Sequence, residues 1–115
     1  MARTLEAVQP VTTDELKRKI DRGDTFVLIE TLAQHEFRRM HLPGAVNAPP
    51  LRIRELAPVL APDKDTEIVT YCAGPRCHAS GNAARELVDL GYTKVRHYPG
   101  GKEDWTAARF PVETG

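Results

Sequence analysis

The segment EIVTYCAGPRCH, residues 67–78, contains the two features from which we infer the fold. Its first part, residues 67–71, is β-branched and aromatic, a composition typical of a strand. Gly74 and Pro75 then interrupt regular structure, so residues 73–78 are predicted to form a loop. The segment therefore predicts a strand that delivers Cys72, at its C-terminal end, into a loop.

Strands and helices are predicted to alternate on both sides of this segment. The continuous apolar run 26–29 indicates a strand buried on both faces, which implies parallel pairing. The remaining predicted elements are strands at 45–48 and 94–98 and helices within 12–23, 33–39, 53–60, 83–90 and 102–108. This alternation predicts an α/β domain with a mainly parallel central sheet and helices on both faces. Ligands of such sheets bind outside the carboxyl ends of the strands, which is where Cys72 is predicted to lie.

The helix boundaries carry sequence signals of different strength. Thr12 followed by Glu15 forms a capping box, which predicts the start of the first helix. Gly23 and Gly91 are predicted to end their helices in the left-handed conformation. Pro58 lies inside the segment 53–60 and leaves the length of that helix open.

Length and composition limit the classes of protein that the chain can represent. With 115 residues, we expect a single domain over residues 1–115. The 16 basic residues balance the 16 acidic ones, so the net charge creates no positive electrostatic field that would attract nucleic acid or an anionic membrane. No apolar run approaches the roughly 20 residues of a membrane span, and MARTLEAVQP has no signal-peptide core. We therefore expect a cytoplasmic protein with no nucleic-acid and no membrane partner.

The chain contains two cysteines, Cys72 and Cys77, which lie in one short stretch. Two cysteines five residues apart exclude a scaffold built on several disulfides. In a reducing cytoplasm, two thiols this close together are expected to have a chemical role rather than a structural one. A zinc site formed with His78 is not expected, because structural zinc needs four ligands and no second ligand pair exists. We therefore predict no metal.

The predicted loop can hold a nucleophilic sulfur together with an anionic substrate. Backbone N–H groups of a curled loop can converge on the Cys72 sulfur, and a following helix adds a partial positive charge. Each of these groups favours thiolate over thiol and also binds an oxyanion. Cys72 is the candidate nucleophile, and the candidate substrate-binding residues are Ala73, Gly74, Pro75, Arg76, Cys77 and His78.

Five motifs, in order along residues 11–113, resemble the rhodanese family of sulfurtransferases. They comprise the strand and acid at 26–30, the Glu-Phe and His-Leu-Pro-Gly-Ala-Val-Asn motif within 36–47, Tyr-Cys at 71–72, the helix pattern 83–92 and Gly-Gly-x-x-x-Trp at 100–105. The resemblance implies a three-layer fold with a central sheet of about five strands. It also implies turn and core roles for the Gly-Gly pair and Trp105, and we expect His41 to be structural.

The resemblance to rhodaneses implies a function and a set of partners. Members of that family move a sulfane sulfur from a donor such as thiosulfate to a thiophilic acceptor, and they hold it as a cysteine persulfide. Cys72 would carry the persulfide here, and the loop residues 73–78 would supply the amide cradle. No cofactor is implied. The expected partners are a small anionic sulfur donor and a thiol acceptor, which includes a thioredoxin-like protein.

The chain departs from the family's pattern at three places. Glu30-Thr31-Leu32 replaces the usual Asp-x-Arg, so another residue must supply any cation that pairs with the acid. Cys77 occupies the position where many active members have the arginine of Cys-x-x-x-x-Arg. Counting back from Ala83 also predicts a loop about two residues longer than the common six-residue form.

Two alternative functions remain open at this point. The chain could be a non-catalytic rhodanese module that binds proteins or senses sulfur. It could also be a thiol phosphatase or arsenate-reducing enzyme, in which Cys77 would resolve an intermediate on Cys72. The phosphatase pattern Cys-x5-Arg would need arginine at the position of His78. Cys77 can equally be a packing residue, and His78 can be an exposed residue of the first helical turn.

Overall fold

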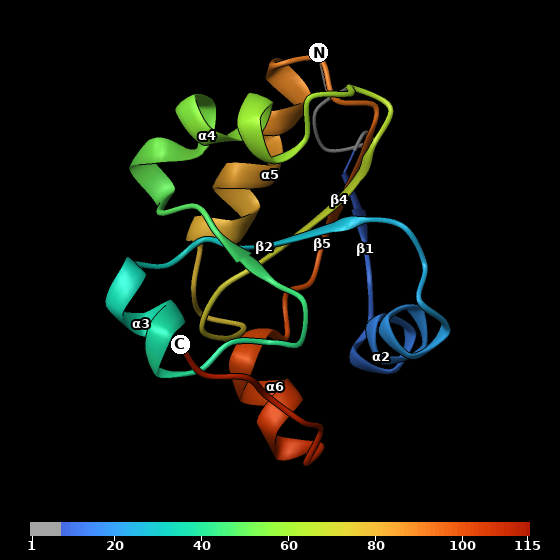
Figure 1. Cartoon of the computed structure of the whole chain (residues 1–115), viewed down its shortest axis with the longest axis vertical. Helices are drawn as coiled ribbons and strands as arrows, with labels where there is room; N and C mark the ends of the chain where they lie inside the picture. The colour runs from blue at the N-terminus through green and yellow to red at the C-terminus, as the bar shows by residue number, and fades with distance from the viewer. Residues whose placement is uncertain (1–7) are drawn as a thin grey trace.

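The computed structural model describes residues 8–115, and its centre is a five-stranded parallel sheet (Figure 1). The strands are β1 (Val8–Pro10), β2 (Val27–Glu30), β3 (Val46–Asn47), β4 (Glu67–Tyr71) and β5 (Lys94–His97). Their spatial order is β1-β5-β4-β2-β3, and every neighbouring pair is parallel. This architecture confirms the predicted α/β class and the parallel pairing.

The register of the sheet brings three strand ends together. Glu30, at the end of β2, lies opposite Tyr71, at the end of β4. Thr70 of β4 lies opposite His97, the last residue of β5. Because all the strands run in one direction, the carboxyl ends of β2, β4 and β5 share one edge of the sheet. Cys72 follows β4 directly at that edge.

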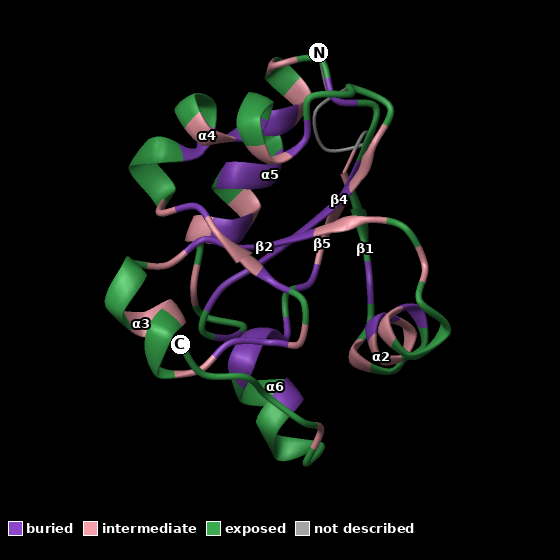
Figure 2. Ribbon diagram, in the orientation of Figure 1, coloured by how far each residue is buried: buried purple, intermediate pink, exposed green. Residues whose placement is uncertain are grey.

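Helices cover both faces of the sheet and bury two apolar cores (Figure 2). The helices are α2 (Thr13–Arg22), α3 (Gln34–Arg39), the 3₁₀ turn η1 (Pro50–Arg52), α4 (Ile53–Leu60), α5 (Ala79–Asp89) and α6 (Gly101–Ala107). One core packs α4 and α5 against Ile29, Ile68 and Val95. The other packs α2 and α6 against the opposite face of the sheet, around Leu16 and Trp105. None of the helices within residues 8–115 has the length and apolarity needed to cross a membrane.

Most of the predicted helix signals are present in the structure. Thr12 Oγ1 accepts a hydrogen bond from the amide of Glu15 at 3.1 Å, and Gly23 ends α2 at a φ of 72°. Pro58 lies inside α4 without ending it, since the helix continues to Leu60.

The helix after the cysteines begins earlier than predicted. It starts at Ala79, because residues 79–82 form its first turn ahead of Ala83. Residues 73–78 therefore separate Cys72 from α5, and the added residues that were assigned to the loop belong to the helix.

The edge strand β1 was not predicted from the sequence. It has three residues, ends in a proline and is only partly buried, so it lacks the apolar run that marks the central strands. It pairs with β5, where Val8 lies opposite Val95. A short edge strand of this kind depends on the neighbouring strand more than on its own residues.

Several motif residues have structural roles. His41 is buried, its Nδ1 lies 2.8 Å from the carbonyl oxygen of Phe37, and its ring stacks on that phenyl ring at 3.8 Å between centroids. Its backbone pairs with Glu113 near the C-terminus. Trp105 is fully buried and donates through Nε1 to the carbonyl oxygen of Pro111 at 2.8 Å. These contacts agree with the structural roles expected for His41 and Trp105.

Candidate active site

Cys72 is held at the carboxyl end of β4 by bonds to its backbone neighbours. The amide of Thr31 donates to the Tyr71 carbonyl at 2.9 Å, and the amide of Tyr98 donates to the Thr70 carbonyl at 2.8 Å. Only 1% of Cys72 is exposed. The strand end is therefore fixed from both sides, and the Cys72 sulfur lies below the surface.

The cysteine loop, residues 72–78, turns back on itself and joins its two sulfurs. The amide of Cys77 donates to the Gly74 carbonyl at 3.0 Å, which closes a tight turn. The Cα atoms of Cys72 and Cys77 are 6.3 Å apart, and the two residues form a disulfide. The loop therefore curls enough to bring the two cysteines together.

The first turn of α6 lies directly beneath this loop. The amide of Lys102 donates to the Cys72 carbonyl at 3.1 Å, and the amide of Glu103 donates to the Ala73 carbonyl at 2.9 Å. Gly101 has a φ of 63°, and a Cβ atom added there would lie 2.6 Å from the Cys72 carbonyl oxygen. A side chain at Gly101 would therefore push the loop away, which gives the Gly-Gly pair a physical role beside the cysteine.

The predicted substrate-binding residues surround the disulfide at different depths. The exposed ones are Ala73, Pro75, Arg76 and His78, whereas Gly74 is buried and Cys77 is half-buried. Within residues 8–115, the Arg76 and His78 side chains form no hydrogen bond or ion pair. The Cys77 amide is engaged in the turn, so that particular N–H is not available to a ligand.

Two residues next to Cys72 were not identified from the sequence. The Ser80 hydroxyl lies 3.2 Å from the Cys72 sulfur and 2.8 Å from Nε2 of His97. Ser80 is 1% exposed in the first turn of α5, and His97 ends β5. A signal was present, because Ser80 precedes Ala83, Ala84 and Leu87 at helical spacing and so places a hydroxyl on the buried face.

The imidazole of His97 is suited to work in its neutral form. Burial, with a smaller effect from the Arg85 guanidinium, lowers the pKa of His97. A neutral imidazole offers one donor and one acceptor, and a hydroxyl offers one donor and two acceptor sites. Ser80 can thus accept from a thiol while it donates to His97. It can equally donate to a thiolate while it accepts from the N–H of His97.

A buried ion pair supplies the cation missing from the Asp-x-Arg position. Lys102 Nζ lies 2.9 Å from Glu30 Oε2, and the two side chains are 7% and 0% exposed. The Tyr71 hydroxyl donates to Glu30 Oε1 at 2.8 Å. Burial, with a further contribution from the Glu30 carboxylate, raises the pKa of Tyr71 well above its usual value. Lys102 therefore pairs with the acid from a different element, α6.

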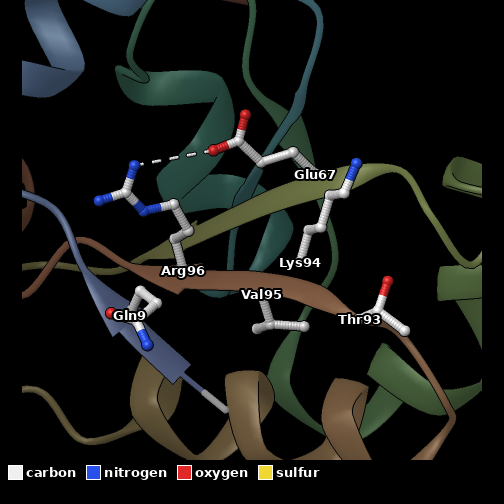
Figure 3. Close-up of a pocket in the computed structure, with 6 residues that line it drawn as sticks. All are labelled: Gln9, Glu67, Thr93, Lys94, Val95 and Arg96. Atoms are coloured by element: carbon white, nitrogen blue, oxygen red, sulfur yellow. Dashed lines mark ion pairs between the residues drawn. The ribbon is translucent and has the colours of Figure 1, made fainter. Parts of the chain in front are cut away.

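Hollows lie at both ends of the sheet. One of about 310 Å³ borders the cysteine loop and is lined by Leu32, Glu36, Arg39, Met40, Ala73, Lys102, Glu103 and Thr106. A larger one of about 470 Å³ lies at the amino ends of β4 and β5, where Arg96 pairs with Glu67 (Figure 3). Open α/β sheets bind ligands at the carboxyl ends. The hollow beside the loop is therefore the one that belongs to the candidate site. Within residues 8–115, no group of three His, Cys, Asp or Glu side chains could hold a metal ion.

Comparison with known proteins identifies relatives of this chain. Residues 12–108 match the rhodanese-like domain family. An HTH-type transcriptional regulator of Mycobacterium tuberculosis is 35% identical over 106 residues, which are 91% of this chain and 45% of that protein. Thiosulfate sulfurtransferase PspE of Escherichia coli is 31% identical over 75 residues, which are 65% of this chain and 70% of PspE. The chain thus spans less than half of the mycobacterial regulator.

A solved structure of similar fold is described as rhodanese with anions from Escherichia coli. It is 28% identical, has a TM-score of 0.65, and the match covers 77% of this chain and 98% of that one. The family match includes Cys72, its loop and the supporting helix α6. The chain therefore belongs to the rhodanese-like domain family.

Proposed function

We propose that this chain is a sulfurtransferase that moves a sulfane sulfur from an anionic donor such as thiosulfate to a thiophilic acceptor. The observation that carries the proposal is Cys72 itself. It stands at the carboxyl end of the central strand β4, and its sulfur is within hydrogen-bond distance of Ser80. Membership of the rhodanese-like family and the similarity to a thiosulfate sulfurtransferase support the same reaction.

The proposed cycle begins once the Cys72–Cys77 disulfide has been reduced, because a disulfide holds no nucleophile. The Cys72 thiolate attacks the outer sulfur of thiosulfate. The bond between the two thiosulfate sulfurs breaks, sulfite leaves with the electron pair, and Cys72 becomes a persulfide. An acceptor such as cyanide then takes the outer sulfur as thiocyanate and restores the thiolate. These two half-reactions form a ping-pong cycle.

Residues of the loop and its neighbours have distinct roles in this proposal. Arg76 and His78 stand exposed at the mouth of the loop, where a cationic side chain would attract the anionic donor. The Ser80 hydroxyl lies within hydrogen-bond distance of both the Cys72 sulfur and His97 Nε2. In the reduced protein this pair would accept the proton of the Cys72 thiol and then donate a hydrogen bond to the thiolate. The candidate amide cradle is the loop backbone around Gly74.

The test is sulfur transfer by the reduced protein with thiosulfate as donor and cyanide as acceptor. Cys72→Ser should lower thiocyanate formation by at least about a thousandfold, as loss of a covalent nucleophile does. Lys94→Ala is the matched control, because Lys94 is exposed at the opposite end of the sheet. Substantial thiocyanate formation by Cys72→Ser would refute the proposal.

The proposed reaction also needs a sulfur acceptor and a compartment in which the cysteines stay reduced. We propose a thiol acceptor, with a thioredoxin-like dithiol protein as one candidate, and a reducing cytoplasm as the location.

The disulfide also favours a second candidate function, reduction of an oxyanion such as arsenate with Cys77 as the resolving thiol. Arsenate-dependent loss of free thiols in the reduced protein, without any sulfur donor, would support that alternative.

A further inference from the structure

We propose that Cys77 resolves the Cys72 persulfide, so that the chain can release the sulfane sulfur as hydrosulfide and consume a dithiol reductant. This activity rests on the proposed persulfide, but it has a different product. Transfer to an acceptor leaves Cys72 as a thiolate, whereas resolution leaves the Cys72–Cys77 disulfide that the structure contains.

The geometry of the loop determines which sulfur Cys77 can attack. The disulfide places the Cys77 sulfur in bonding contact with the inner sulfur, Sγ of Cys72. The Cα separation of 6.3 Å lies within the range of roughly 4.4–6.8 Å that disulfides adopt. Attack on the outer sulfur would only move the persulfide from Cys72 to Cys77. Attack on the inner sulfur expels the outer one, and this is the contact that the loop supports.

The bonds that hold the loop also favour this direction of attack. The Cys72 carbonyl accepts from the Lys102 amide, so the attacked residue is fixed by α6. The Cys77 amide donates to the Gly74 carbonyl, and this turn brings the attacking residue back over Cys72. Cys77 is half-buried while Cys72 is buried, so a reductant meets the disulfide from the Cys77 side.

The resolving step balances in atoms, charge and electrons. The sulfur of Cys77 forms a bond to Cys72 Sγ, and the bond between Sγ and the outer sulfur breaks. The outer sulfur leaves with the electron pair and takes the proton of the Cys77 thiol, which gives HS⁻. The two cysteine sulfurs are oxidised to a disulfide, and the sulfane sulfur is reduced to sulfide. A dithiol such as dithiothreitol or a thioredoxin-like protein then reduces the disulfide by thiol exchange.

A single-turnover experiment separates this inference from the proposed function. The protein is reduced, freed of reductant under anaerobic conditions and mixed with thiosulfate. Sulfite, sulfide and intact mass are then measured for the original chain, Cys77→Ser and Cys77→Ala. We expect sulfite and sulfide in equal amounts from the original chain, which ends lighter by two hydrogen atoms. Peptide mapping should place the new bond between Cys72 and Cys77.

The variants should stop at the persulfide. Cys77→Ser and Cys77→Ala should release sulfite as the original chain does, gain one sulfur atom, and release no sulfide in the first turnover. A persulfide that persists in the original chain, with sulfite released and no sulfide, would overturn the resolving role and leave the sulfurtransferase intact. Absence of sulfite from all three proteins would instead refute the proposed function. Folding of the variants does not decide the outcome, because the original chain alone distinguishes the two products.

Discussion

The two ends of the parallel sheet differ in how their polar side chains are used. At the amino ends of β4 and β5, Arg96 pairs with Glu67 (Figure 3). In addition, Lys19 Nζ lies 2.9 Å from Glu67 Oε1, and Arg96 NH1 lies 2.9 Å from Glu15 Oε2. At the carboxyl ends, the Cys72 sulfur meets a neutral hydroxyl, and the nearby cation of Arg76 has no ion pair within residues 8–115.

This difference distinguishes the hollow at the amino ends of the strands from the hollow of the candidate site. Surface ion pairs such as those at the amino ends stabilise the fold modestly. Once the Cys72–Cys77 disulfide is reduced, the buried Cys72 sulfur can exist as a thiol or a thiolate, and the Ser80 hydroxyl can hydrogen-bond to either form. The larger of these two hollows lies at the amino ends of the strands, away from Cys72, so cavity size alone does not indicate the candidate site.

The largest expected effect on stability comes from Lys102. Lys102→Met would leave Glu30 buried without its partner, and breaking a buried pair costs about 3–5 kcal/mol. The matched variant at the opposite end, Lys19→Met, should cost less, because Glu67 is 23% exposed and remains open to water. Urea unfolding at neutral pH measures both. Equal losses for the two lysines would remove the distinction between the ends, and Glu30→Gln should recover part of the Lys102→Met loss.

The next prediction tests the role of the Ser80 hydroxyl beside Cys72. Ser80→Ala removes a hydrogen bond to the thiolate, which is worth about 1.5 kcal/mol or roughly tenfold. We expect iodoacetamide to alkylate Cys72 about tenfold more slowly at neutral pH in Cys77→Ser/Ser80→Ala than in Cys77→Ser alone. Adding Thr93→Ala instead removes a hydroxyl at the amino end and should leave the rate unchanged. An unchanged rate in the Ser80 variant would assign that hydroxyl to packing alone.

A smaller effect is expected at the exposed cation of the loop. Arg76→Ala should raise the KM for thiosulfate by up to about fivefold, since an exposed charge contributes about 0.2–1 kcal/mol. Added salt should shrink the difference, and kcat should change little. Lys94→Ala, an exposed cation at the other end, is the control. A KM that rises equally in both variants would indicate general attraction of the anion rather than contact at the loop.

The smallest effect concerns pH. His97 has a folded pKa below its unfolded value of 6.5, so the unfolded chain binds more protons between the two values. Its contribution to stability is therefore complete above the unfolded pKa and is lost as the pH falls through the lowered folded pKa. Replacement by Gln should therefore flatten the dependence of stability on pH below about pH 6.5. Urea unfolding across that range tests this, with His78→Gln as the exposed control. If the unfolding free energy of His97→Gln keeps the same dependence on pH, another titrating group causes that dependence.

The sequence predicted the central parts of the fold better than the periphery. The strands β2 and β4 were recognised because most of their residues are apolar, aromatic or β-branched, whereas β1 has three residues and ends in Pro10. The start of α5 was placed too late because Ser80 and Gly81 are weak helix formers. In the structure the Ser80 carbonyl accepts a hydrogen bond from Thr70 Oγ1 at 2.9 Å, which ties this first turn to β4.

The position of Cys72 at the end of a strand was predictable from the sequence, but its neighbours in space were not. Cys72 follows from one segment, because a strand and a loop meet there. The contact between Ser80 and His97 joins residues 17 positions apart and depends on the register of β4 and β5. Register is set by the whole sheet, so no local pattern specifies that pair. The meeting of Cys72 with Cys77 depends in the same way on the curvature of the loop.

Lys102 connects the cysteine loop to a buried ion pair, which affects how easily the loop can open locally. Its amide holds the Cys72 carbonyl, while its ammonium group pairs with Glu30 and donates to the Glu36 carbonyl at 3.0 Å. Loops generally open at a small fraction of the free energy of global unfolding. The attachment of this loop can open only if a buried ion pair opens with it. We therefore expect the Lys102 amide to exchange its hydrogen as slowly as the amides of the core strand β4, so that Cys72 keeps its position until that strand unfolds.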